Sequence, residues 1–345
     1  MTTAHVREGR GTRAAGPLYV HIQRRMTPEH REWLEDGLLP GIQVTDGDSP
    51  ASPSTEILVA GLPVRAEISA LAGLHALIVP WASIPKATRL VLEEFPELSV
   101  HNLHHNAAST AELAITLALA AAKRVIPVDR ALRERDWQAC LDPAANLLLD
   151  GLAAVVLGYG AVGKRVARAC VGLGMQVIAV RRHPSTLGSS LEGVEVRSSE
   201  ALGRSLREAQ VLIITLPLTD ETIGMIGPDE LELLPRGALL VNVARAEIVD
   251  EEGLYEALRR KRLAAAGIDV WHKEPSRAEL ERGDRIAVSR FSFETLDNLV
   301  MSPHRGGALG VERNERRRFD ELASLLNAAA LGNPMPNRVS RDLWY

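Results

Sequence analysis

Residues 156–184 read VLGYGAVGKRVARACVGLGMQVIAVRRHP, and this stretch decides the fold. An apolar run leads into the pattern Gly158-x-Gly160-x-x-Gly163, a helical stretch follows, and a second apolar run covers 177–180. A strand, a glycine-rich turn and a helix in this order are the context in which the pattern binds a dinucleotide. The three glycines permit a tight turn, close approach of a pyrophosphate and close helix–strand packing. We therefore predict a dinucleotide-binding βαβ unit.

The second apolar run ends in arginines. In units that bind NAD, an Asp or Glu about 20 residues past the motif holds the ribose hydroxyls. Here Arg181 and Arg182 occupy that place, with Ser185 and Thr186 close behind. A guanidinium cannot accept hydrogen bonds from hydroxyls, but it forms charge-assisted bonds to a 2′-phosphate. The alternative is a pair of exposed surface arginines. The sequence favours NADP(H) as the cofactor, with NAD(H) possible.

Other apolar runs predict an α/β fold with two domains. Runs at 18–22, 56–60 and 75–80 are typical of buried strands in a parallel sheet. Beyond the glycine-rich unit, further runs continue a doubly wound sheet at 211–215, 238–242, 264–269 and 299–302. We predict two Rossmann-like domains. A dinucleotide-binding domain, 109–308, is inserted into a smaller flavodoxin-like substrate (lid) domain, 1–108, which 309–345 completes.

Residues 109–138 predict a long helix at the start of the second domain. The segment AELAITLALAAA is apolar around most of its circumference, until Pro127 breaks the helix. A helix this apolar is buried on several sides, typically between domains or subunits. We therefore expect a homodimer with 109–124 at its interface.

The composition excludes several classes of partner. The chain has 345 residues, 46% hydrophobic and 24% charged, with a formal net charge of −4. This balance gives no electrostatic footprint for nucleic acid or an anionic membrane. No apolar run approaches the ~18 residues of a membrane span, and the N-terminus lacks the apolar core of a signal peptide. Two cysteines, Cys140 and Cys170, fit a cytoplasmic location. We expect no metal site.

Three polar residues follow apolar runs of the second domain. Arg245 follows LLVNVA, Glu274 follows AGIDVWHK, and His304 follows NLVMSP. Because α/β sheets bind ligands outside the carboxyl ends of their strands, we expect these side chains at one edge of the sheet. Each residue taken by itself also has a simpler interpretation: Arg245 as a surface charge, Glu274 as a loop acid and His304 as a solvated loop histidine. Their shared position predicts a functional site.

The chain resembles the D-isomer-specific 2-hydroxyacid dehydrogenase family, with its glyoxylate/hydroxypyruvate reductase-like and phosphoglycerate dehydrogenase-like members. The resemblance covers most of the chain from about residue 50 to 307. It rests on GYGAVGKRVA, LPLTDETIGMIG, VNVARAEIVDEEGL, AGIDVWHKEP and NLVMSPHRGG, in the family's order and spacing. Together these motifs are highly specific, and they imply an NAD(P)-dependent oxidoreductase.

The resemblance assigns roles to single residues. The arginine of the family's N-x-A-R motif binds the substrate carboxylate and carbonyl, which implies this role for Arg245. The P-H histidine is the acid/base and the E-P glutamate pairs with it, which implies these roles for His304 and Glu274. The D-V aspartate, here Asp269, contacts the nicotinamide carboxamide. Further cofactor contacts are implied at Gly158, Tyr159, Gly160, Ala161, Val162, Gly163, Leu216, Pro217, Thr222, Val243, Ala244 and Gly306.

The family also has a loop whose backbone amides grip the substrate carboxylate. It matches VPWASIPK, which implies substrate contacts at Trp81, Ala82, Ser83 and Ile84.

Two departures from the family pattern stand out. Family members usually have Arg-Gly where this chain has Arg245-Ala246. The change is mild if the backbone angles at this position are ordinary. Before the long helix, family members often have Asn-Thr-Pro-Gly. This chain has NLHHNAASTAE there, with His104 and His105 inserted. These histidines either touch the substrate or are solvated loop residues, and the second interpretation is favoured.

These assignments predict a reductase mechanism. A 2-oxo acid needs its carboxylate fixed, its carbonyl polarised and a proton for the alkoxide that hydride transfer creates. Arg245 supplies a bidentate fork and the amides at 82–84 a carboxylate nest. His304 donates the proton, and Glu274 orients its ring and favours the charged form. The predicted function is reduction of small 2-oxo acids, such as glyoxylate and hydroxypyruvate, to D-2-hydroxy acids.

Two other functions stay open on sequence grounds. One is a dinucleotide-sensing regulatory protein on the same fold, like the transcriptional corepressors related to this family. The other is a dehydrogenase of a phosphonate-type acid in a biosynthetic pathway, because a fork and an amide nest accept either anion.

Overall fold

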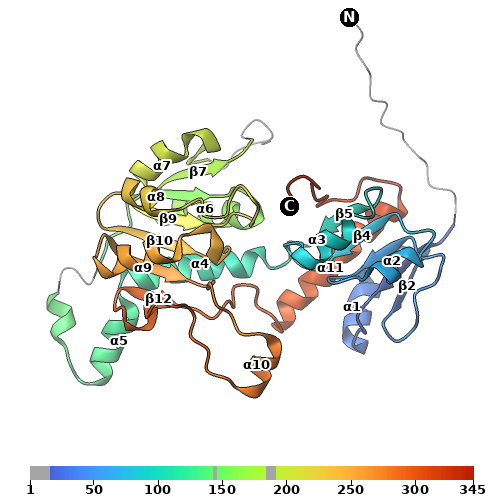
Figure 1. The fold of residues 1–345 in the computed structure, drawn as a ribbon, viewed down its shortest axis with the longest axis horizontal. Coiled ribbons are helices and arrows are strands. Elements are labelled where there is room, and N and C mark those ends of the chain that lie inside the picture. The colour runs from blue at the N-terminus through green and yellow to red at the C-terminus, as the bar shows by residue number, and fades with distance from the viewer. Residues whose placement is uncertain (1–15, 143–145, 184–191) are drawn as a thin grey trace, which may run out of the picture. The chain divides into compact units, whose positions relative to one another are not determined.

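The computed structural model describes residues 16–142, 146–183 and 192–345, so the N-terminal tail and the pair Ser185 and Thr186 lie outside the described residues. The chain divides into two compact units (Figure 1). The first unit takes in the chain up to His105 together with Gly310–Tyr345, and the second is Asn106–Leu309.

The first unit is built on a five-stranded parallel sheet in the order β2-β1-β3-β4-β5. This is the strand order of flavodoxin-like sheets. The predicted runs at 18–22, 56–60 and 75–80 form β1, β3 and β4, whereas the two edge strands were not predicted. The strands are β1 Leu18–Ile22, β2 Ile42–Asp46, β3 Ile57–Val59, β4 Ala76–Val79 and β5 Ser99–Asn102.

Helices cover both faces of this sheet. The helices of the first unit are α1 Pro28–Gly37, α2 Arg65–Ser69, α3 Lys86–Leu92 and α11 Glu312–Ala330. α1 and α11 pack together on one face, where Trp33 and Phe319 join the core. α2 and α3 cover the other face through Ile68 and Leu92. α11 thus returns the chain to the first unit, and the segment after it pairs with the edge strand β5.

The second unit is built on a seven-stranded parallel sheet in the order β12-β11-β10-β9-β6-β7-β8. The chain runs outward from β6 to β8 and then returns to β9 on the other side of β6. This reversal is the switch point at which such sheets bind ligands. β8 was not predicted. The strands are β6 Ala153–Leu157, β7 Gln176–Arg181, β8 Val194–Ser198, β9 Val211–Ile214, β10 Ala238–Asn242, β11 Leu263–Ile268 and β12 Leu299–Met301.

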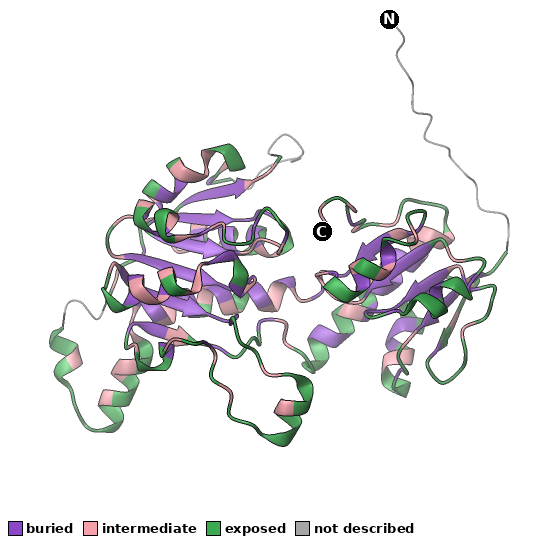
Figure 2. Ribbon diagram, viewed as in Figure 1, coloured by how far each residue is buried: buried purple, intermediate pink, exposed green. Residues whose placement is uncertain are grey.

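The central strands of this sheet are buried between two layers of helices, as Figure 2 shows. α4 and α6 lie on one face, and α7, α8 and α9 lie on the other. The helices are α4 Ala107–Ala122, α5 Val125–Arg133, α6 Ala161–Gly172, α7 Leu202–Glu208, α8 Pro228–Leu233, α9 Glu251–Arg259 and α10 Arg277–Arg282. None of the helices in the described ranges has the length and apolar character that crossing a membrane requires.

The long apolar helix ends earlier than predicted. α4 stops at Ala122, and Arg124 takes a left-handed φ of 47° before α5 begins. The prediction that Pro127 breaks the helix is therefore wrong. Pro127 lies in the first turn of α5, where a backbone N–H has no helical partner to lose. Most of the apolar side chains of α4 are buried or half-buried inside the second unit, where Leu117 contacts Gly267 of β11.

Candidate active site

The glycine-rich turn joins the carboxyl end of β6 to the start of α6. Gly158 has a φ of 94°, and a Cβ on Gly163 would lie 1.8 Å from the carbonyl oxygen of Gly158. Both positions therefore require glycine. Gly160 is exposed, and no described atom lies within 4 Å of a Cβ built there. This open space at the first turn of α6 fits a dinucleotide pyrophosphate, as the motif predicts.

Two threonines shape the neighbouring loops. The hydroxyl of Thr215, directly after β9, donates to the carbonyl of Gly158 at 2.8 Å, a brace that the sequence did not reveal. Thr222, a predicted cofactor contact, is buried, and its hydroxyl donates to the carbonyl of Pro217 at 2.7 Å. Its evident task is to shape the loop after β9. The other predicted cofactor residues here are Tyr159 and Val162, buried and half-buried, Ala161, exposed, and Leu216 and Pro217, half-buried.

The arginines stand at the carboxyl end of β7. Arg181 is the last residue of the strand and Arg182 follows it, with no acid at either place. Arg182 forms an ion pair with Glu221, which lies in the loop after β9. Both arginines are half-buried. They therefore stand where a ribose or its 2′-phosphate is expected in this fold.

Arg245 is presented by a tight loop after β10. The side chain of Asn242 closes this loop: its amide donates to the Arg245 carbonyl at 2.9 Å, and its oxygen accepts from the Ala244 N–H at 3.0 Å. Val243 and Ala244 are buried. Burial lowers the pKa of the Arg245 guanidinium, while the Glu274 carboxylate acts in the opposite direction. An arginine stays charged in either case.

Ala246 replaces the glycine of the family motif without strain. It begins a short 3-10 turn, Ala246–Ile248, and is absent from the described non-glycine residues with positive φ. The backbone angles are therefore ordinary, which is the condition under which the change is mild.

His304 and Glu274 are in direct contact. The His304 Nδ1 lies 2.9 and 2.8 Å from the two carboxylate oxygens of Glu274. The Glu274 hydrogen bond raises the pKa of His304, and burial opposes this. Burial is the largest single influence on Glu274 and opposes its ionisation, but the contact with His304, the Trp271 N–H and the Arg245 charge together outweigh it, so the pKa of that carboxyl is lowered. With Nδ1 engaged, Nε2 is the ring nitrogen left for proton exchange.

The charge of Arg245 reaches both members of this pair. It lowers the pKa of Glu274 and opposes the rise in the pKa of His304. The structure therefore brings together the three residues that follow β10, β11 and β12. The arrangement offers a fixed cation beside a histidine that can hold or release a proton.

Asp269 is fully engaged with the loop that carries His304. Its side chain is 1% exposed and accepts from the Ser302 hydroxyl at 2.5 Å and from the Arg305 and Gly306 N–H groups, both at 2.9 Å. A Cβ on Gly306 would lie 2.9 Å from the same carboxylate. Asp269 therefore fixes the His304 loop, a role that the sequence did not predict. Its contact with the nicotinamide stays a prediction.

The loop 81–84 follows β4 in the first unit. Trp81, Ala82 and Ser83 are half-buried, and Ile84 is 1% exposed. The Trp81 ring lies against Gly61, where a Cβ would come within 2.2 Å of it. The loop therefore has a defined conformation within its own unit.

Comparison with known proteins decides the family. A family model described as "D-isomer specific 2-hydroxyacid dehydrogenase, NAD binding domain" matches residues 115–306. The chain belongs to the D-isomer specific 2-hydroxyacid dehydrogenase family. The family assignment and an NAD(P)(H) cofactor, both predicted from the motifs, are confirmed, and the two-domain α/β fold predicted from the apolar runs is confirmed as well.

Individual relatives of this dehydrogenase support the same family. A glyoxylate reductase of Korarchaeum cryptofilum is 32% identical over 240 residues, which are 68% of this chain and 67% of that protein. A glyoxylate reductase of Thermococcus kodakarensis is 30% identical over 298 residues, 84% of this chain and 82% of that protein. The crystal structure of a D-isomer specific 2-hydroxyacid dehydrogenase from Xanthobacter autotrophicus Py2, in complex with NADPH and MES, shares the fold. It has a TM-score of 0.76, 23% identity, and coverage of 95% and 99% of the two chains.

The two inserted histidines of this dehydrogenase are not solvated loop residues. His105 is 9% exposed and contacts Arg318 of α11. His104 is half-buried, and its backbone N–H donates to the Glu321 carboxylate. Burial and the Arg318 charge lower the pKa of His105 to about 4, so it is neutral at physiological pH. The favoured interpretation is therefore wrong, because packing on α11 in the first unit was invisible in the sequence.

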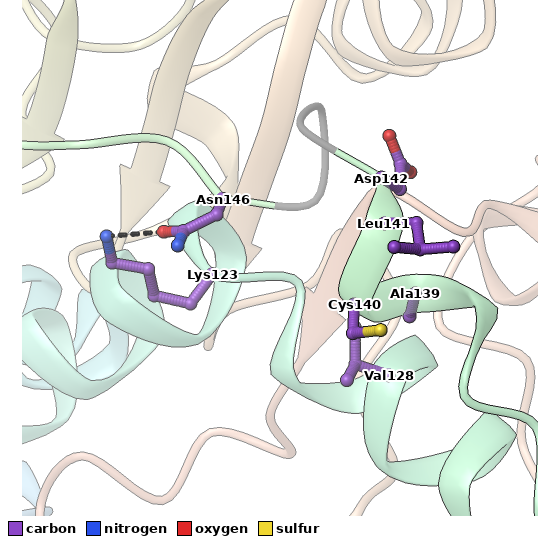
Figure 3. Close-up of a pocket in the computed structure, with 7 residues that line it drawn as sticks. All are labelled: Lys123, Val128, Ala139, Cys140, Leu141, Asp142 and Asn146. Atoms are coloured by element: carbon purple, nitrogen blue, oxygen red, sulfur yellow. Dashed lines mark hydrogen bonds between the residues drawn. The ribbon is translucent and has the colours of Figure 1, made fainter.

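The second unit also has a hollow on its surface. Figure 3 shows it between α5 and the short 3-10 helix Gln138–Leu141, with the Lys123 ammonium on the Asn146 side chain at 2.7 Å. Its lining consists of Lys123, Val128, Ala139, Cys140, Leu141, Asp142 and Asn146. No residue of the predicted site lines this hollow.

Proposed function

We propose that this dehydrogenase reduces small 2-oxo acids to D-2-hydroxy acids and prefers NADP(H). The observation that carries the proposal is the His304–Glu274 pair within reach of the Arg245 charge, at the carboxyl edge of the sheet that bears the glycine-rich turn. Two relatives are named glyoxylate reductase, so glyoxylate and hydroxypyruvate are the first substrates to test.

Each residue has a defined task in this proposal. The nicotinamide cofactor supplies a hydride when bound. Arg245 binds the substrate carboxylate and polarises the carbonyl with its planar fork. The amides at 82–84 share the carboxylate. His304 gives its Nε2 proton to the forming alkoxide, and Glu274 holds the ring through Nδ1 and stabilises its charged form. We assign dinucleotide binding to the second unit and the substrate domain to the first.

A substrate panel tests this function. NADPH oxidation followed with a dozen 2-oxo acids should show turnover of at least one small acid and formation of the D-isomer. Absence of turnover with every acid, combined with tight NADPH binding, would instead favour a regulatory protein.

Cofactor preference should depend on Arg181 and Arg182. We expect kcat/KM to favour NADPH over NADH, and Arg181→Asp to narrow or reverse that preference. Loss of a charge-assisted phosphate contact costs about 1.5–3 kcal/mol, roughly ten- to a hundredfold. Arg236, exposed just before β10 at the opposite end of the strands, provides the matched control Arg236→Asp, which should leave the ratio unchanged. Equal use of both cofactors by the wild type would contradict the assignment.

We further propose a homodimer, but with a different surface from the one that the sequence suggested. Much of the apolar surface of α4 is already buried within its own unit, where Leu113, Ile115 and Leu119 are half-buried. Exposed apolar residues lie just after α4, on α5 and the following segment, and Figure 2 colours much of the α5 ribbon as exposed. They include Val125, Ile126, Leu132, Trp137, Leu141 and Leu148. Their concentration in one segment of the chain makes this segment the candidate interaction surface.

Sedimentation tests the dimer. The wild type should sediment as a dimer at micromolar concentration, and Trp137→Asp should shift it to a monomer, because Trp137 is 69% exposed. Leu280→Asp on α10 replaces a similarly exposed side chain (63%) outside this segment and should leave the dimer intact. A monomeric wild type, or a dimer unaffected by Trp137→Asp, would contradict this placement.

A cytoplasmic location is also proposed. Cys140 is exposed and Cys170 is buried, and both are free thiols. Free thiols of this kind are ordinary in a reducing compartment.

A further inference from the structure

The carbonyl groups of the loop 81–84 are fixed by the neighbouring strand β5. The side-chain amide of Asn102, the last residue of β5, donates to the Ala82 carbonyl at 2.8 Å. The next backbone N–H, that of Leu103, donates to the Trp81 carbonyl at 3.3 Å. Asn102 is 3% exposed and Ala82 is half-buried, so the bond between them is partly shielded from water. Two successive carbonyl groups of the loop are thus held toward β5.

Holding these carbonyl groups also sets the direction of two N–H groups. In a planar trans peptide the C=O of one residue and the N–H of the next point in opposite directions. The Trp81 carbonyl therefore directs the Ala82 N–H away from β5, and the Ala82 carbonyl does the same for the Ser83 N–H. These are two of the amides that the proposed function assigns to the substrate carboxylate.

Asn102 is itself held in place by the C-terminal segment. Its N–H donates to the Asn337 carbonyl at 3.2 Å, and its carbonyl accepts from the Asn337 side-chain amide at 3.1 Å. That amide also donates to the Glu321 carboxylate of α11 at 2.7 Å. Glu321 in turn accepts from the His104 N–H at 2.9 Å. A continuous chain of hydrogen bonds therefore runs from α11 through Asn337 and Asn102 to the loop.

We propose that Asn102 is a positioning residue for substrate binding: its side-chain amide aims the backbone amides of Ala82 and Ser83 at the substrate carboxylate. This inference rests on the proposed function, because it takes that loop as the carboxylate site. It gives Asn102 no contact with the substrate. Loss of the Asn102 side-chain amide should therefore weaken the binding of the acid without changing the rate of hydride or proton transfer.

Asn102→Asp tests the donor without changing the size of the side chain. A carboxylate cannot donate to the Ala82 carbonyl. We expect KM for the 2-oxo acid to rise about tenfold or more at alkaline pH, the effect of about one lost hydrogen bond. kcat and the Kd of NADPH should stay close to wild type, the pattern of lost uniform binding. The difference from wild type should narrow as pH falls, because a protonated carboxyl can donate again.

Asn298→Asp is the matched control. Asn298 is also buried, at 8% exposure, and its amide also donates to a backbone carbonyl, that of Leu258 at 3.2 Å, but in the second unit. The same substitution there should leave KM for the 2-oxo acid unchanged. An equal rise of KM in both variants, or no rise in Asn102→Asp, overturns the proposal.

A measurement without substrate separates this inference from the proposed function. Asn102→Ala removes the donor without introducing a charge, and the exchange of the Leu103 amide reports whether the loop stays docked. Exchange faster by roughly tenfold or more supports the proposal, while unchanged exchange overturns it, whatever the enzyme reduces. If the wild type reduces no 2-oxo acid, the proposed function fails, and Leu103 exchange still decides whether Asn102 holds the loop.

Discussion

Arg245→Lys should lower kcat/KM for 2-oxo acids by about a hundredfold or more while leaving the Kd of NADPH almost unchanged. Lysine keeps the positive charge but loses the planar fork, which pairs with a carboxylate through two parallel bonds. One lost charged hydrogen bond costs about 1.5–3 kcal/mol, and the fork supplies two. Steady-state kinetics with the preferred acid, together with fluorescence titration of NADPH, measures both quantities.

The local structure makes this substitution a test of the fork rather than of folding. The Arg245 loop is closed by the Asn242 side chain through backbone atoms, and these bonds remain in a lysine variant. Arg245 also donates to the Ala244 carbonyl at 2.6 Å, a bond that a lysine ammonium can replace. Near-normal activity of Arg245→Lys would mean that the carboxylate is held elsewhere and that the proposed site is wrong.

The second unit was the more predictable part of the fold. Its central strands are buried on both faces and read as continuous apolar runs, so the run before Gly158 and the runs 211–215 and 238–242 could be found directly. The strands that escaped prediction are β2, β5 and β8, each at the edge of its sheet. Edge strands have one solvated side and carry polar residues, as SVHN in β5 and VEVRS in β8 show. Their apolar pattern is too short to detect.

The candidate site likewise has residues that the sequence predicts and residues that it does not predict. Residues whose chemistry is visible as a motif, such as Arg245, Glu274 and His304, were predicted from their places after strands. The residues that hold them were not, because their roles depend on contacts between segments far apart in sequence. Asp269 was predicted for a different contact, yet it binds the backbone of residues 305 and 306. Asn242 drew no prediction at all, although it stands inside the VNVAR motif.

Glu274→Gln should move the pH profile of 2-oxo acid reduction toward lower pH and leave residual activity. Reduction needs protonated His304, so the rate should hold at low and neutral pH and fall as pH rises through the His304 pKa. The Glu274 hydrogen bond raises that pKa against the effect of burial. A neutral amide still orients the ring but no longer stabilises the imidazolium, so the fall should begin at lower pH. Oxidation of the hydroxy acid needs neutral His304 and should show the mirror image.

His304→Ala provides the reference for this experiment. It removes the proton donor, so kcat should fall by roughly 10²–10⁴ in both directions, and the limb that reports the His304 pKa should disappear. The Kd of NADPH should be close to the wild-type value in both variants, because neither side chain contacts the phosphates in this mechanism. The decisive comparison is the reductive pH profile of Glu274→Gln against wild type. Since Glu274 touches His304 only through Nδ1, an unshifted profile would mean that this contact has no part in the acid strength of the histidine. Glu274 would then leave the mechanism, and His304 would act without its partner.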